Sequence, residues 1–424
     1  MAGRRLKGRL SRMRELGLVK ASDLRPRSDA ASAPEGDVGS PPAKAGRGAI
    51  ARAAVARGAL PSFLDGWERI GELAWSRTLR KRDRLPDSID AAPFRRISSR
   101  AAISRGPGKG DAAPCPGRVD SGSLRFFDFE TTGLSGGTGT IAFLAAVARR
   151  EGGELAVRQF FLEDYPGERA FLEAILAELP EESVVVTYNG SSFDLPLLRT
   201  RCVMNGMEAP SRSHVDALFA ARRLWKRVCG GASLGLIERE VLGVERQEDV
   251  PGSMIPGLYF SYLRSGDEPL MRIVMSHNAD DVASLASLVA RADSIFGDPR
   301  RHAGSSSVDR AGLGRSLIAA GREAEGEELL EAALGDGDEA AGLLLSRRYR
   351  RSGRIEDRGR VIAMLPETYR SDVERAKFRE HVARDLPAAL AWAEKAAGLA
   401  STEGEAMAAE ARIERLKGKH GAGL

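Results

Sequence analysis

The pattern of hydrophobic and polar positions between residues 121 and 300 alternates between two periods. Apolar runs at 124–134, 141–147 and 155–162 are rich in residues that favour strands. Three consecutive strands with short connections predict an antiparallel meander. Ser183–Tyr188 is a fourth run, short and β-branched, which is typical of a strand buried on both faces.

The segments between and after these runs have helical periodicity. Helices are predicted at Glu168–Leu179, 193–205, 215–228, 232–242 and 269–296. The last segment is the longest, and polar residues interrupt its apolar stripe near the middle. Strand signals followed by alternating strand and helix signals predict an α/β fold, in which a sheet is layered with helices.

The first 120 residues show different patterns. Residues 1–20 have Leu and Met positions set among Arg and Lys, which predicts a short basic amphipathic helix. Residues 21–60 are rich in Ala, Pro, Gly, Ser and Arg and have no sustained periodicity, so we expect them to be mostly disordered. Residues 62–84 carry enough large apolar side chains to predict a packed helix, and 99–120 have linker composition.

The tail from residue 305 has almost no strand signal and repeats internally. Similar turns occur at 321, 353 and 385, which are 32 residues apart. The repeat resembles tetratricopeptide-like helical hairpins, which stack to bury a shared core. Such a tail either binds a protein partner or supports the preceding domain. The predicted organisation is a basic leader at 1–60, a short helical segment and linker at 61–120, an α/β domain at 121–300 and a helical-repeat domain at 305–424.

Composition narrows the class of protein. The chain has 424 residues, of which 42% are hydrophobic and 29% charged, as in soluble proteins with buried cores. No apolar run is long enough to span a bilayer, and the N-terminus lacks the apolar core of a secretion signal. The three cysteines are scattered, which suits a reducing cytoplasm and gives no zinc cluster. We therefore expect a cytoplasmic protein that has no membrane partner.

Charge is distributed unevenly along the chain. Residues 1–120 carry 25 Lys or Arg against 13 Asp or Glu, so the remainder has a net charge of −7 within a total of +5. A basic leader before an acidic body indicates a polyanionic partner for the leader. The alternative is a solvated tail that binds nothing.

Candidate chemistry begins with two acids in the first strand. Asp128 and Glu130 are two residues apart and so point to the same face of that strand, among three phenylalanines. Two like charges in an apolar strand repel each other and are costly to desolvate, and a cation between them removes both costs. Carboxylate oxygens suit Mg²⁺ or Mn²⁺. The alternative is a strand end whose acids face water.

Further ionisable residues complete the pattern. Asp194 follows the Tyr-Asn-Gly turn after the fourth strand and begins a helix, where an acid is also a common cap. His277 and Asp281 are four apart and share one face of the last helix, close to its apolar stripe. Asp280 is an adjacent candidate that points in a different direction. Asp216, which we do not count as a ligand, is either a residue that supports the ligands or a helix cap.

This constellation resembles the DnaQ-like superfamily of 3′–5′ exonucleases, which has the ribonuclease H fold and four acidic metal ligands. The Asp-Phe-Glu-Thr-Thr-Gly-Leu block at Asp128 is specific to that group. A closer resemblance, over residues 121–298, is to the YprB-like branch of ribonuclease H-like proteins. The motifs that carry it are Gly136–Thr140, Tyr188–Gly190, His214-x-Asp216 with Arg222–Lys226, Pro251–Pro256 and His277-Asn-x-x-Asp281.

The resemblance implies a ribonuclease H-like mixed sheet and hydrolysis of phosphodiester bonds with two divalent metal ions, Mg²⁺ or Mn²⁺. It assigns four metal ligands, which are Asp128, Glu130, Asp194 and Asp281. The superfamily places a Tyr with three residues, or a His with four, before the last ligand. Here His277 has three intervening residues and occupies the general-base position. The expected substrate contacts are Thr131, Gly133, Asn189, Arg222 and Arg223.

Three functions remain open at this point. The first is a 3′–5′ exonuclease acting on an end of single-stranded DNA or RNA. The second is an adaptor that keeps the fold, binds nucleic acid or protein, and turns over poorly. The third is a structure-specific endonuclease. The helix at 215–228 carries a basic cluster that would hold the substrate backbone, or that merely forms a solvated helix face.

Overall fold

The computed structural model of the protein describes residues 62–94, 117–133, 139–246, 248–265 and 268–421. Its residues divide into two compact units. The first comprises the described residues up to Phe219 together with Ala232–Asp293. The second comprises Ala220–Gly231 and the described residues from Ser294 onward. The predictions for residues 1–20, 21–60 and the Gly136 motif lie outside the described residues, apart from Gly139 and Thr140.

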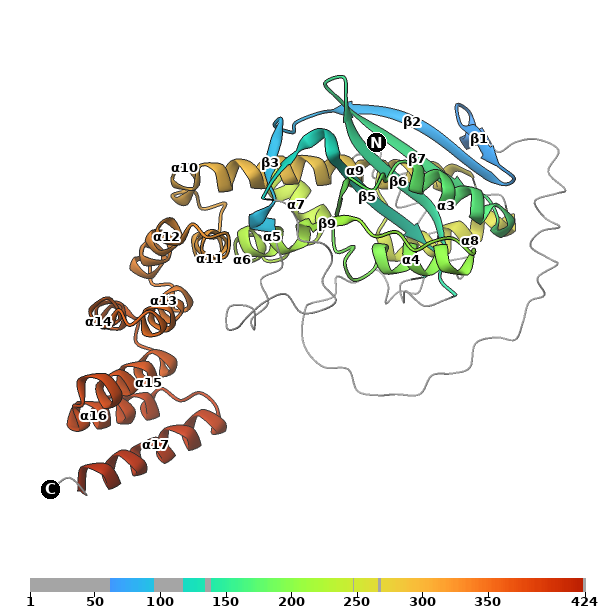
Figure 1. Ribbon diagram of the computed structural model, residues 1–424. Coiled ribbons are helices and arrows are strands. Elements are labelled where there is room, and N and C mark those ends of the chain that lie inside the picture. The colour runs from blue at the N-terminus through green and yellow to red at the C-terminus, as the bar shows by residue number, and fades with distance from the viewer. Residues whose placement is uncertain (1–61, 95–116, 134–138, 247, 266–267, 422–424) are drawn as a thin grey trace. The chain divides into compact units, whose positions relative to one another are not determined.

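The first unit is built on a seven-stranded mixed sheet with the strand order β1-β2-β7-β6-β5-β8-β9 (Figure 1). Neighbouring strands are antiparallel from β1 to β5, whereas β5, β8 and β9 are parallel. The predicted meander and mixed α/β sheet are therefore confirmed. The strands are β1 (Glu68–Gly71), β2 (Ala74–Arg82), β5 (Leu124–Thr131), β6 (Ala142–Glu151), β7 (Glu154–Leu162), β8 (Val184–Thr187) and β9 (Ser213–Asp216). A separate ladder pairs β3 (Ser88–Asp90) with β4 (Arg118–Asp120).

Helices pack on both faces of this sheet (Figure 1). On one face, Phe129 and Phe160 form a core with α3 (Glu168–Ala177) and α4 (Asp194–Met204). On the other, Phe143 and Phe161 pack with α8 (Ile255–Ser265) and α9 (Glu268–Gly297). Adjacent residues such as Phe160 and Phe161 serve opposite cores because side chains alternate along a strand.

The helix predicted at residues 62–84 is wrong, because this segment forms β1 and β2. β2 pairs with β7 along its whole length, from Ala74 opposite Leu162 to Arg82 opposite Glu154. A long antiparallel partner decides the conformation of a segment whose local pattern suits both helix and strand. The predicted domain boundary at residue 121 is wrong for the same reason, since β2 belongs to the sheet.

Two further predictions need correction. The segment predicted as one helix at 215–228 contains the end of β9, then α5 (Ala217–Leu224) and α6 (Lys226–Cys229). The segment at 232–242 is a short helix, α7 (Leu234–Ile237), which continues as one turn of π-helix. α8 has no counterpart among the predicted helices. These elements are short, and helical periodicity is weak over one or two turns.

The second unit is helical, as predicted for the tail. Besides α6 and most of α5, its helices are α10 (Pro299–Ala303), α11 (Arg310–Ala319), α12 (Glu323–Gly335), α13 (Glu339–Arg351), α14 (Ile355–Met364), α15 (Tyr369–Phe378), α16 (Leu386–Gly398) and α17 (Glu403–Gly421). Gly321 and Gly353 adopt φ angles of +85° and +72° at two of the predicted turns, where glycine avoids strain. The tetratricopeptide assignment stays a prediction. Among the described residues, no helix is sufficiently long and apolar to cross a membrane.

Candidate active site

The first two acids lie on β5, inside the sheet between β6 and β8. Phe127 and Phe129 turn toward the core beneath α3 and α4, so the alternation of the strand directs Asp128 and Glu130 to the face covered by α9. Asn278 of α9 donates a hydrogen bond of 2.9 Å to Asp128 Oδ2. The prediction that these two carboxylates share a face is confirmed.

Asp194 joins them from α4, of which it is the first residue. Its carboxylate is buried, and the backbone N–H groups of Phe129 and of Asp194 itself act to lower its pKa, although burial outweighs them. Its charge acts on both Asp128 and Glu130 of β5, so the start of α4 lies close to these two carboxylates. As the first residue of α4, Asp194 therefore adds its charge to the site.

The turn before α4 is held by Asp216 at the end of β9. Asp216 Oδ1 accepts from the Asn189 backbone N–H at 2.8 Å, and Oδ2 accepts from Ser191 Oγ at 2.5 Å. Asn189 has a φ of +71°, which Asn tolerates better than most residues. Asp216 thus fixes the turn that leads to Asp194, and its oxygens are already occupied by these donors.

His277 and Asp281 of α9 complete the group. His277 Nε2 lies 3.7 Å from Glu130 Oε1 and 3.6 Å from Asp281 Oδ2. On the other side of the ring, Nδ1 lies 2.5 Å from Asp249 Oδ1. Arg246 Nη1 is 3.0 Å from the same nitrogen, but a guanidinium only donates. Asp249 is therefore the acceptor for an Nδ1–H, and this bond directs Nε2 toward the carboxylates.

Three carboxylates of this cluster have raised pKa values. Burial, and then the charges of Asp281 and Glu130, raise the pKa of Asp128 well above its usual value. Burial, and then Asp281, raise the pKa of Glu130 to about 8. Burial, and then the charge of Asp216, raise the pKa of Asp194 to about 7. The cluster therefore carries more negative charge than its surroundings compensate.

His277 responds to the same charges in the opposite sense. Burial alone would lower the pKa of its imidazole. The hydrogen bond to Asp249 and the charges of Asp281 and Glu130 outweigh burial and raise the pKa to about 9. Without further cations, His277 is thus protonated at neutral pH and holds a proton at both ring nitrogens.

Arg246 supplies a second positive charge to the cluster. Its Nη2 pairs with Asp281 Oδ1 and with Glu238 Oε1, and the Arg246 side chain is only 10% exposed. Its Nε is buried without a hydrogen-bond partner. Desolvation works against this charge, but the two carboxylates raise the pKa of Arg246 above its usual value.

The four acids offer only carboxylate oxygens, the donors that Mg²⁺ and Mn²⁺ prefer. In the described part of the chain, no three His, Cys, Asp or Glu side chains already surround one point as metal ligands. Asp281 is turned to Arg246, and Glu130 faces His277. The residues fit a divalent cation by chemistry and by their uncompensated charge, and at Asp281 such a cation would join or replace the guanidinium of Arg246 as the compensating charge.

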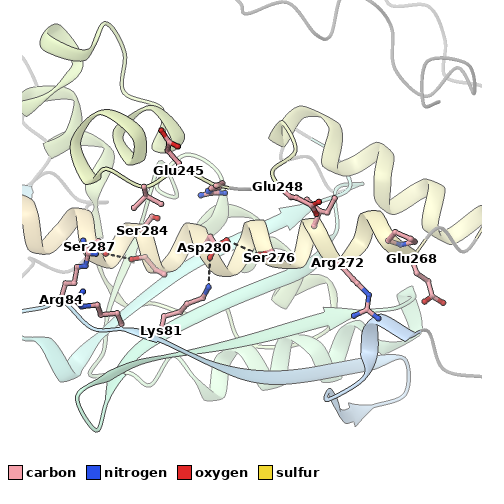
Figure 2. A pocket seen from close by; sticks show the side chains of 16 residues that line it. Lys81, Arg84, Glu245, Glu248, Glu268, Arg272, Ser276, Asp280, Ser284 and Ser287 are labelled. Carbon is pink, nitrogen blue, oxygen red and sulfur yellow. Dashed lines mark hydrogen bonds and ion pairs between the residues drawn. The ribbon is translucent and has the colours of Figure 1, made fainter. Parts of the chain in front are cut away.

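A groove of about 810 Å³ lies beside α9 (Figure 2). Asp280 faces this groove, where Lys81 Nζ donates to its Oδ1 at 2.8 Å and Ser276 Oγ lies 3.3 Å from its Oδ2. Arg246 lines the same groove and reaches Asp281, so the groove borders the carboxylate cluster. Asp280 is thereby excluded as a fifth member of the cluster.

Three predicted substrate contacts follow strands β5 and β8. Thr131 is buried and its Oγ1 donates to the Gly133 carbonyl at 2.8 Å. Gly133 is half-buried, and Asn189 is exposed. Because β5 and β8 are parallel, their carboxyl ends meet at the same edge of the sheet, where ligands bind in such folds. Gly133 and Asn189 remain candidates, whereas Thr131 shapes the turn.

The two predicted arginine contacts belong to the second unit. Arg223 is buried, and its Nε donates to Ser316 Oγ of α11 at 2.7 Å. The prediction that Arg223 contacts the substrate is therefore wrong. Arg222 is exposed on α5 and remains untested. Arg227 of the same basic cluster pairs with Asp309 and Asp338, which also shows that this helix face contacts other helices.

Three residues of the site are absent from the sequence-based predictions. Asn278 stands within the motif that contains His277 and Asp281, and Asp249 stands two residues before the motif that begins at Pro251. Their positions beside recognised motifs were the only available signals. Arg246 lies in a connecting segment without periodicity, and nothing in the sequence marks it.

Comparisons with known proteins identify the family of this chain. The RNase_H superfamily matches residues 125–292. The uncharacterized protein YprB of Bacillus subtilis (strain 168) is 34% identical over 314 residues, which cover 70% of this chain and 75% of YprB. The family B DNA polymerase from Pyrobaculum calidifontis aligns with a TM-score of 0.31 and 19% identity, over 48% of this chain and 29% of the polymerase. The structure of exonuclease I aligns with a TM-score of 0.25 and 17% identity, over 36% of this chain and 43% of the exonuclease. The chain belongs to the family of YprB and carries an RNase H superfamily domain.

Proposed function

We propose that this protein is a metal-dependent nuclease that hydrolyses phosphodiester bonds of nucleic acid from a 3′ end. The observation that carries the proposal is the convergence of Asp128, Glu130, Asp194 and Asp281. They come from three separate elements and meet in one cluster, in which the pKa values of Asp128, Glu130 and Asp194 are raised. Carboxylates held together at such a cost are typical of functional sites.

The four carboxylates would hold two Mg²⁺ or Mn²⁺ ions. Bound there, the ions supply a lowered pKa for an attacking water and stabilisation of the leaving oxygen. Asp128 lies closest to the centre of the group in electrostatic terms, since Asp281, Glu130 and Asp194 all raise its pKa. It would therefore help to hold the ions, and its charge is the one that they would compensate most.

His277 is the proposed general base. Asp249 fixes the proton on Nδ1, so Nε2 is the nitrogen available to accept a proton from water. The charges of Asp281 and Glu130 contribute to its pKa of about 9. Compensation of those charges by cations returns the imidazole toward its ordinary pKa near 6.5, where it accepts a proton at neutral pH. Asp249 then stabilises the imidazolium that forms.

The proposed substrate is an end of single-stranded DNA or RNA. Gly133 and Asn189 lie where the carboxyl ends of β5 and β8 meet, next to the strand that carries Asp128. Both are accessible, and Asn189 offers an amide with two donors and an acceptor, which suits a terminal nucleotide.

The test is digestion of 5′-labelled single-stranded DNA and RNA with Mn²⁺. Wild type is compared with Asp128→Ala and with Asp280→Ala. The second variant is the matched control, because Asp280 is also an aspartate but faces the groove beside α9 instead of the cluster. We expect a ladder that shortens from the 3′ end in wild type and in Asp280→Ala but not in Asp128→Ala. Cleavage of circular substrates would identify an endonuclease instead. Wild-type protein that cleaves neither substrate would overturn the proposal in favour of a binding adaptor.

A further inference from the structure

A row of residues crosses the sheet in register toward the cluster. Arg77 of β2 is opposite Gln159 of β7, Gln159 is opposite Ala146 of β6, and Ala146 is opposite Asp128 of β5. Residues paired across neighbouring strands point to the same face of a sheet. The small side chain of Ala146 therefore leaves space between Gln159 and Asp128 on the face that α9 covers.

Asn278 of α9 bridges that space. Its Nδ2 donates to Asp128 Oδ2 at 2.9 Å, and its Oδ1 accepts from Gln159 Nε2 at 3.0 Å. Gln159 Nε2 also donates to the Met275 carbonyl at 2.8 Å. Arg77 Nε and Nη2 donate to Gln159 Oε1 at 2.9 Å and 2.7 Å. Gln159 and Asn278 are both 0% exposed, so water does not compete for these bonds.

The direction of this chain of hydrogen bonds is fixed by Arg77 at its outer end. A guanidinium has donors only, so the Gln159 oxygen must face Arg77 and the Gln159 amide nitrogen must face α9. That nitrogen requires an acceptor, which turns the Asn278 oxygen toward it. The Asn278 nitrogen is then left to donate to Asp128. Each amide orientation follows from the one before, and neither side chain can flip without leaving a buried group unpaired.

We propose that Arg77, Gln159 and Asn278 form a positioning chain that orients the Asp128 carboxylate for divalent cations. The proposal deepens the proposed function and rests on it. The chain holds one carboxylate oxygen, Oδ2, with a donor and places no donor on Oδ1. Asn278 contacts a metal ligand and not the substrate, so it acts as a positioning residue. Supporting residues of this kind hold a ligand in the rotamer that a metal requires.

A purely structural role for the same bonds is the competing account, since Gln159 and Asn278 also tie α9 to β7. The two accounts differ in what a substitution changes. A tie between elements affects unfolding alone, whereas a positioning chain also affects Mn²⁺ affinity. The effect on affinity should further decline along the chain, from Asn278 to Gln159.

The experiment titrates Mn²⁺ into the full-length protein by calorimetry, beside thermal unfolding in EDTA. Asn278→Ala removes the donor to Asp128, and Gln159→Met removes the partner that orients Asn278. Val289→Ala is the control. It truncates a buried side chain of α9 that lies three turns from Asn278 and does not belong to the positioning chain. We expect the Mn²⁺ dissociation constant to rise roughly 10- to 100-fold for Asn278→Ala and by less for Gln159→Met. Val289→Ala should unfold earlier and keep wild-type affinity.

Two outcomes would overturn the inference in distinguishable ways. If wild type binds Mn²⁺ and both Asn278→Ala and Gln159→Met bind it equally well, the positioning chain is wrong and the proposed function stands. If wild type binds no Mn²⁺, the proposed function fails and this inference fails with it. Should Asn278→Ala not fold, Gln159→Met decides the question alone, because it preserves side-chain length and apolar contact.

Discussion

At the scale of single residues, charge compensation decides the state of the site. Asp128, Glu130 and Asp194 repel one another in a buried environment, and His277 and Arg246 respond to that field. Arg246 pairs with Asp281 Oδ1, so it compensates part of the charge that a divalent cation would also compensate. The guanidinium is thus both a stabiliser of the metal-free protein and a competitor of the metal.

Replacement of Arg246 with Met separates these two effects. Glu238 is buried and would lose its partner, so the free energy of unfolding in EDTA should fall by about 3 kcal/mol. Because the charge of Asp281 would then lack the guanidinium, Mn²⁺ should raise the melting temperature more than in wild type. Thermal unfolding with and without Mn²⁺ measures both effects. Arg239→Met, an exposed neighbour paired with Glu240, is the control. An unchanged or smaller Mn²⁺ shift in the Arg246 variant would contradict the competition.

The raised pKa values make stability depend on pH. The pKa is raised to about 8 for Glu130, about 7 for Asp194 and about 9 for His277. In each case the folded state binds protons more tightly than the unfolded state, so stability is present at low pH and is lost as pH rises through these values. In EDTA, the free energy of unfolding should therefore fall between pH 5 and pH 9.

Urea unfolding across that range measures this slope. Asp194→Asn should reduce the slope, because it removes one of the groups whose titration produces it. Glu151→Gln, at an exposed position on β6, should leave it unchanged. A flat profile for wild type in EDTA would show that the cluster is not charged as described. Mn²⁺ should oppose the slope, since it binds the deprotonated carboxylates.

The residues of the site differed in how well the sequence predicted them. Asp128 with Glu130, and His277 with Asp281, follow from the periods of a strand and a helix, which place them on shared faces. Arg246 reaches the cluster from a connecting segment, where no period relates sequence to position. Such a contact depends on the tertiary path of the chain, and no single local window contains it.

At the scale of elements, β2 shows the limit of local pattern. Its sequence has the apolar content of a packed helix, yet its partner β7 makes it a strand. β5 to β8 were predictable because each is bounded by turns and rich in residues that favour strands. The pairing of β2 with a strand 80 residues later leaves no mark within either segment.

Trp75 is the side chain that anchors β2 to the sheet. It is buried in the core under α8 and α9, and its Nε1 donates to Glu163 Oε2 at 3.0 Å. Trp75→Ala should lower the free energy of unfolding by about 3–5 kcal/mol, as for other large buried aromatic residues. Thr78→Ala, exposed on the same strand, is the control and should change it by less than about 0.5 kcal/mol. Equal effects in urea unfolding would contradict the assigned position of β2.

At the scale of the whole molecule, each compact unit has its own packing requirements. In the second unit, α11 lies so close to α5 that a Cβ on Gly312 would stand 1.8 Å from the Arg223 carbonyl oxygen. Because the backbone cannot move aside as a flexible side chain can, Gly312→Ala should lower the free energy of unfolding by about 1–3 kcal/mol.

Gly418→Ala provides the control for this substitution. Gly418 lies in α17 with nothing near its Cβ position, so alanine there should be neutral or stabilising by up to about 1 kcal/mol. Thermal unfolding compares the two variants, and Mn²⁺ binding should remain at the wild-type level in both. Equal stability of the two variants would show that α11 and α5 are not in close contact.

The assignment of Ala220–Gly231 to the second unit has a consequence for modularity. The chain leaves the first unit within α5, returns at Ala232, and leaves again after Asp293, so no single cut separates the two units. A fragment that ends near residue 300 would keep α5 but lose Ser316, the partner of the buried Arg223, and Asp309, which donates to the Leu224 carbonyl. The helical tail is thus not a removable appendage. Gene fusions, truncations and domain exchanges of this protein are expected to succeed only when they carry both units together.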